Sequence, residues 1–78
     1  MQTNIKGEIL NIQKIISRNV RDHIAASGFT QAEVARRLGV DRSNFYNQLN
    51  AGTFKVCRLV QVAKILDVRL GDLLVGVE

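Results

Sequence analysis

The feature that most constrains this fold is a tight break at residues 39–41, glycine-valine-aspartate, between two segments of helical character. Before the break, a helix that begins at Gln31 carries three apolar residues on one face: Val34, Ala35 and Leu38. Glycine ends helices readily because it adopts the left-handed conformation without steric cost. Asp41 is a typical N-cap, since its carboxylate accepts from free amides and suits the positive end of a helix. The sequence therefore predicts two short helices joined by a tight turn.

Both of these helices carry further local signals. Residues 30–33 predict a capping box, in which the Thr30 hydroxyl and the Glu33 carboxylate each accept from the other residue's amide. The second helix is expected from Arg42 to about Asn50. Within it, Phe45 and Leu49 lie only about 40° apart around the axis, so they define its buried side.

Apolar residues at steps of three and four predict three more helices. The first spans about residues 9–26 and carries one stripe: Ile9, Ile12, Ile16, Val20 and Ile24. Another spans about residues 55–66, and residues 70–74 form a short last helix. For Thr3 to Ile9, a flexible arm and a short strand both remain open. The expected fold is all-α, with five helices; a strand remains an alternative only for residues 3–9.

Length and composition narrow the class of protein. A chain of 78 residues is too short for two cores, so one domain is expected over 1–78, with an extension (1–15), a five-helix core (16–74) and a tail (75–78). The net charge of +4 favours polyanionic partners such as nucleic acid or anionic lipid. The single cysteine, Cys57, excludes an intramolecular disulfide and predicts a reducing compartment. With no membrane span and no signal peptide in the sequence, we expect a cytoplasmic protein.

The exposed side of the helix over 42–50 has a distinctive chemistry. Two short helices joined by a tight turn are typical of a helix-turn-helix, whose second helix enters the major groove of DNA. Ser43, Asn47 and Asn50 lie on the side opposite Phe45. Asn44 and Tyr46 flank that side and Arg42 lies on the first turn, so the exposed face consists of short or planar hydrogen-bonding groups. Arginine can bind guanine, asparagine can bind adenine, and serine can serve either base. A merely solvated face would more often carry lysine and glutamate.

Residues 29–45, FTQAEVARRLGVDRSNF, closely resemble the lambda-repressor-like, or Cro-type, helix-turn-helix family. The resemblance continues through residues 59–68 and 70–74, which are similar to the family's fourth and fifth helices. It implies that Gln31 binds a phosphate at the start of the second helix. It also implies that Arg42, Ser43 and Asn47 read bases and that Asn50 contacts a phosphate. Asn44, Tyr46 and Lys55 are the remaining candidates for secondary or phosphate contacts.

Three departures from the family pattern are present. Gln48 occupies a position that is commonly apolar, and Gly52 comes one residue later than the family's turn glycine. The loop after the recognition helix is therefore expected to be longer, which leaves the position of Lys55 less secure. Where several family members pair an arginine with a glutamate, this chain has Ile24 and Leu49. This exchange concerns stability rather than DNA reading, because aliphatic residues can replace an internal ion pair without loss.

Several residues are assigned no role in binding or catalysis. Arg36 and Arg37 are expected to form a solvated face, Phe45 to lie in the core, and His23 and Cys57 to be bystanders near the surface. Nothing in the sequence frames a nucleophile, a paired base or a metal-ligand set. We therefore expect no enzyme, no cofactor, no metal and no membrane partner.

These observations favour a sequence-specific regulator of transcription that binds double-stranded DNA, of the phage or mobile-element repressor type. The alternative is a protein-interaction module or antitoxin that uses the same fold to bind a protein such as a toxin or polymerase. A homodimer is expected, helped by residues 3–9, with contacts from the C-terminal apolar residues Leu73, Leu74, Val75 and Val77. Its alternative is a frayed tail on a monomer.

Overall fold

The computed structural model describes residues 5–77, and all the regular structure in that range is helical. The five helices are α1 (Ile5–Ser27), α2 (Gln31–Leu38), α3 (Arg42–Ala51), α4 (Val56–Leu66) and α5 (Leu70–Leu73). The expected all-α, five-helix fold is confirmed. Each of these helices is too short or too polar to span a bilayer.

Helix α1 begins earlier than the sequence reading placed it. It starts at Ile5 rather than near Ile9, so the flexible arm and the short strand are both wrong for residues 5–9. Thr3 and Asn4 lie outside the described residues. The apolar spacing of α1 extends back from Ile9 to Ile5, and one glycine at position 7 costs too little to stop a helix.

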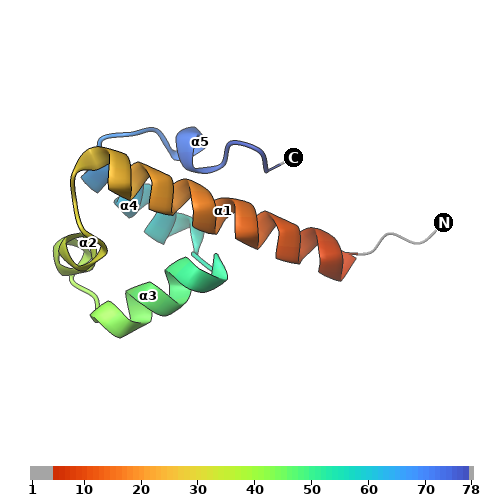
Figure 1. The fold of residues 1–78 in the computed structure, drawn as a ribbon, viewed down its shortest axis with the longest axis horizontal. Helices are drawn as coiled ribbons and strands as arrows, with labels where there is room; N and C mark the ends of the chain where they lie inside the picture. Colours follow the sequence, from red (N-terminus) through yellow and green to blue (C-terminus); the bar gives the residue numbers. More distant parts are fainter. Residues whose placement is uncertain (1–4, 78) are drawn as a thin grey trace.

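Helix α1 is the long element against which much of the chain is arranged (Figure 1). It packs against α3, α4 and α5, while α2 packs against α3 and α4. In Figure 1, α2 and α3 lie on one side of α1 and α5 lies on the other. The first turns of α1 project beyond the other helices, and there Ile9 is 47% exposed. The outer end of the predicted stripe is therefore not part of the core.

The core is formed by buried residues from all five helices. Phe45 and Leu49 of α3 are fully buried, as their positions around the helix predicted. Val20 and Ile24 of α1 are buried in the same cluster. Burial of each large apolar side chain stabilises the fold by about 2 kcal/mol. These contacts fix which side of α3 faces inward and leave the opposite side exposed.

The turns at the two ends of α3 differ in their surroundings. Gly39 ends α2 with φ 72° and has open space around its Cα. Gly52 ends α3 with φ 67°, and a Cβ there would overlap the backbone of Gln13 in α1. Glycine at position 52 is thus required both by its backbone conformation and by the close approach of another helix. The turn glycine is at position 52 because α3 continues to Ala51.

The C-terminal segment folds back along α1. The side-chain amide of Asn19 donates to the carbonyl oxygens of Leu73 at 3.0 Å and Val75 at 2.8 Å. Leu73 is fully buried, so its assignment to a dimer surface is wrong: the side chain is used to fill this molecule's own core. The alternative of a frayed tail is also wrong at these two residues. Leu74 and Val77 are half-buried, whereas Val75 is 65% exposed.

Candidate nucleic-acid interface

The first turn of α3 is capped by Asp41 and presents polar side chains to solvent. The Asp41 carboxylate accepts from the backbone amide of Asn44 at 3.3 Å, which confirms the predicted N-cap. Arg42, Ser43, Asn44 and Asn47 are all exposed, so the low burial expected for the base-reading residues is observed. Because α3 itself contains no acidic residue, its exposed face carries only donors, amides, hydroxyls and one positive charge.

The start of α2 is capped by Thr30, but the full capping box does not form. Thr30 Oγ1 accepts from the amide of Glu33 at 3.1 Å, which is the predicted half of the motif. The Glu33 carboxylate instead accepts from Arg36 and Arg37, with its shortest hydrogen bond at 2.6 Å. A charge-assisted bond to a guanidinium is stronger than one to a neutral amide, which explains this choice. Gln31 is half-buried at the first position of α2.

Arg36 and Arg37 lie on an exposed face of α2, as expected, and they are engaged there with neighbouring side chains. Hydrogen bonds from Arg36 and then Arg37 lower the pKa of Glu33, and the same pairing raises the pKa of Arg36. The Arg37 guanidinium also stacks over the ring of Phe29, 4.7 Å from its centroid. This local network occupies both arginines within α2 and its preceding turn.

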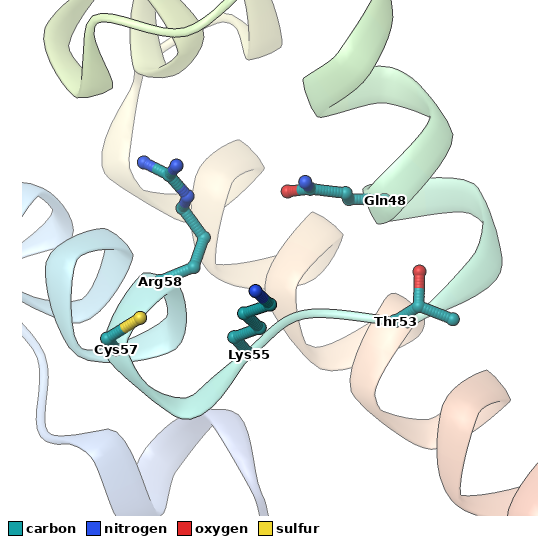
Figure 2. A pocket seen from close by; sticks show the side chains of 5 residues that line it. All are labelled: Gln48, Thr53, Lys55, Cys57 and Arg58. Carbon is teal, nitrogen blue, oxygen red and sulfur yellow. The ribbon is translucent and has the colours of Figure 1, made fainter.

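A small pocket lies between the end of α3 and the start of α4 (Figure 2). In this view Gln48 of α3 extends in from the right, Arg58 of α4 rises on the left, and the side chain of Lys55 lies below them. Lys55 is the N-cap residue of α4, and its carbonyl oxygen accepts from the amide of Leu59 at 3.0 Å. The backbone of Lys55 is therefore fixed at the start of α4. Thr53 and the exposed Cys57 complete the pocket.

Arg58 is a candidate that the sequence reading missed. It is half-buried, lines this pocket and donates to Gln61 at 3.0 Å. Its spacing from Lys55 offered a signal, because residues three apart on a helix lie on the same face. Two cations at positions 55 and 58 could thus have been recognised as one basic edge at the start of α4.

The last turn of α3 is connected to α1. A guanidinium N–H of Arg21 donates to the side-chain oxygen of Asn50. This contact joins residues that are 29 positions apart, so no local pattern in the sequence predicted it. Leu49 and Ile24 are both buried, so aliphatic side chains pack at these two positions.

Tyr46 and His23 are less exposed than Arg42, Ser43 and Asn47. Tyr46 is half-buried and packs against the core, so only part of its ring is available to a ligand. His23, expected near the surface, is half-buried in α1. Among residues 5–77, no three histidine, cysteine, aspartate or glutamate side chains gather in a way that could hold a metal ion.

A family model described as a Cro/C1-type helix-turn-helix DNA-binding domain matches residues 19–78. No curated protein and no solved structure matches the chain. The match includes the capped α2 and α3, the pocket at the start of α4, and α5, while most of the long first helix precedes it. The chain therefore belongs to the Cro/C1-type helix-turn-helix DNA-binding family.

Proposed function

We propose that the protein is a sequence-specific regulator of transcription, of the phage or mobile-element repressor type, which reads double-stranded DNA with α3. The observation that carries this proposal is the chemistry of the exposed face of α3. That face carries one arginine, one serine and three asparagines, and the opposite side of the same helix is buried in the core. A rigid helix with such side chains suits the major groove, where bases present both donors and acceptors.

The base-reading role is assigned to three exposed residues near the start of α3: Arg42, Ser43 and Asn47. The N-terminal part of a recognition helix is the part that contacts base edges. In this arrangement Arg42 donates two hydrogen bonds to a guanine. Asn47 donates and accepts on an adenine, and Ser43 serves either base.

Phosphate contacts are assigned to residues around this helix. Gln31 lies at the first position of α2, where free backbone amides and the helix dipole favour an anion. The other members of the proposed set are Asn44, Tyr46, Asn50 and Lys55. We add Arg58, a second cation that lines the same pocket as Lys55. These contacts hold the protein on the DNA backbone but carry no sequence information.

We further propose that the protein acts in the cytoplasm as a homodimer. One recognition helix reads only a few base pairs, whereas two related by two-fold symmetry read half-sites about 34 Å apart. Leu74, Val75 and Val77 remain candidates for the contact, joined by the exposed apolar residues of the projecting part of α1: Ile5, Ile9 and Leu10. Sedimentation of the full chain and of a chain ending at Leu74 tests this. The dimer would be excluded if both chains sediment as monomers and only one copy of the protein binds each DNA site.

The decisive experiment is selection of bound sites from random double-stranded DNA, followed by binding measurements on Arg42→Ala and Asn47→Ala. Each variant should lose about 1–3 kcal/mol on the selected site and relax preference at one base position. Gln31→Ala should instead weaken binding to all sequences about equally. A protein-interaction module or antitoxin would select no sequence, and its partner binding would depend less on salt than phosphate contacts do.

A further inference from the structure

Arg21 lies on α1, outside the helix-turn-helix, yet its side chain contacts the end of the recognition helix. Its guanidinium donates to the side-chain oxygen of Asn50, and both side chains are exposed. We propose that Arg21 is a positioning residue that orients the amide of Asn50 so that its NH2 group faces a DNA phosphate. This proposal rests on the proposed function, in which Asn50 contacts the backbone of DNA.

The chemistry of the amide explains why orientation matters. An asparagine side chain has an oxygen that only accepts and a nitrogen that only donates, and rotation about one bond exchanges them. A phosphate only accepts, so it binds the nitrogen and is repelled by the oxygen. A guanidinium only donates, so it binds the oxygen. With Arg21 on one side and phosphate on the other, only one orientation of Asn50 satisfies both.

The protein backbone holds both partners in place before DNA arrives. Arg21 follows the fully buried Val20, and Asn50 follows the fully buried Leu49. The next turn, at Gly52, lies directly against the backbone of α1. The two side chains therefore start from fixed positions, and their hydrogen bond adds order only to the exposed ends.

A second cation of α1 lies near the same amide. Lys14 lines a surface depression together with Asn50, Gln13, Leu10 and Ala51. Lys14 and Arg21 are seven residues apart, close to two helical turns, so they project from the same side of α1. A phosphate that accepts from Asn50 would thus lie near positive charge from a helix outside the recognised motif.

Arg18 provides a matched control. It is an exposed arginine on the same helix, less than one turn from Arg21, and within residues 5–77 its side chain makes no hydrogen bond or ion pair. Arg18→Gln removes the same charge from α1 as Arg21→Gln without removing a contact to α3. Because both residues are exposed, both variants should melt like the wild type.

The experiment measures binding to the selected DNA site at several salt concentrations for Arg21→Gln, Arg18→Gln, Asn50→Ala and the Arg21→Gln/Asn50→Ala double variant. We expect Arg21→Gln to bind about three- to tenfold more weakly than Arg18→Gln, since it loses a charge-assisted contact besides its charge. In the Asn50→Ala background, Arg21→Gln should cost no more than Arg18→Gln costs in the wild type. Asn50→Asp should bind more weakly than Asn50→Ala, because it directs a carboxylate at the phosphate.

Nuclear magnetic resonance supplies a readout that general destabilisation would not move. The side-chain NH2 signals of Asn50 should shift in Arg21→Gln and stay in place in Arg18→Gln. The positioning role would be overturned if Arg21→Gln and Arg18→Gln weakened DNA binding equally. It would also be overturned if Arg21→Gln weakened binding as much in the Asn50→Ala background as in the wild type. If Arg42→Ala and Asn47→Ala still impair site preference in that case, the positioning role is wrong but the proposed function is retained. If the wild type selects no DNA, both proposals are wrong.

Discussion

The two ends of α3 differ in how they are held. At the N-terminal end, Asp41 caps the helix through a backbone amide, and within residues 5–77 the side chains of Arg42 and Ser43 form no hydrogen bond. At the C-terminal end, Leu49 is fully buried and Gly52 lies against α1. The rest of the protein thus fixes one end and leaves the side chains of the other free. Within this helix of ten residues, the polar side chains of the first turn are thus free, whereas the last turns are held by the core and by α1.

The largest effect is expected from a charge at the fixed end. Leu49→Asp would bury an unpaired carboxylate among Phe45, Ile24 and other apolar residues, so it should cost about 4 kcal/mol or more and unfold this small domain. Asn47→Asp is the matched control, since it adds the same charge on the exposed side of α3 and should melt nearly like the wild type. Thermal melting followed by circular dichroism compares them. Equal melting temperatures would mean that burial does not distinguish the two sides of α3.

The second effect compares the two glycine turns. Gly39→Ala and Gly52→Ala impose the same strain of a side chain at positive φ, which costs about 1 kcal/mol. Only at Gly52 does the added methyl also meet the backbone of Gln13, so α1 and α3 must separate. We expect Gly52→Ala to lose about 3 kcal/mol or more in total, measured by urea unfolding. If the two variants lose the same stability, the turn at Gly52 does not hold α3 against α1.

The same contrast separates what the sequence predicted from what it did not. The buried side of α3, the Asp41 cap and the short turn at Gly39 follow from helical spacing and local backbone chemistry, and all are present. The contact of Arg21 with Asn50 and the approach of Gly52 to α1 depend on how distant segments pack. Spacing along one helix contains no information about such contacts.

In two other cases, a residue recognised in the sequence has a different partner in the structure from the one expected. Glu33 had the correct position for a capping box, but two guanidinium groups within the same helix bind its carboxylate. Leu73 was a candidate for the dimer contact, yet it is fully buried in this molecule's own core, and the Asn19 amide holds the backbone that follows it. In both cases the residue was recognised, and its partner was not.

The third effect concerns the cap at the free end. Asp41→Ala removes the acceptor for the Asn44 amide and should cost about 1 kcal/mol of stability. Asp41→Asn keeps an acceptor at the same place, so it should restore most of that loss. Chemical denaturation measures both. A loss from Asp41→Ala as large as that from Gly52→Ala would show that the N-terminal end of α3 is held as firmly as the C-terminal end.

The smallest effect is expected on α2, away from both ends of α3. Arg36 and Arg37 lower the pKa of Glu33 below its ordinary value of 4.5, so the folded state favours the carboxylate. The stability that this pair contributes is therefore present above about pH 4.5 and is lost as the pH falls through the lowered pKa. Because the pair is exposed, the contribution is small.

Glu33→Gln tests this pair against the two ends of α3. The difference in unfolding free energy between wild type and Glu33→Gln should stay constant above about pH 5 and shrink as the pH falls toward 3. The variant also leaves Arg36 and Arg37 without their carboxylate, so its binding to random DNA should strengthen slightly and depend more steeply on salt. Its preference for the selected site should not change, because the proposed base-reading residues lie on α3. A change in base preference would mean that recognition extends into α2, and that the free end of α3 does not read the sequence alone.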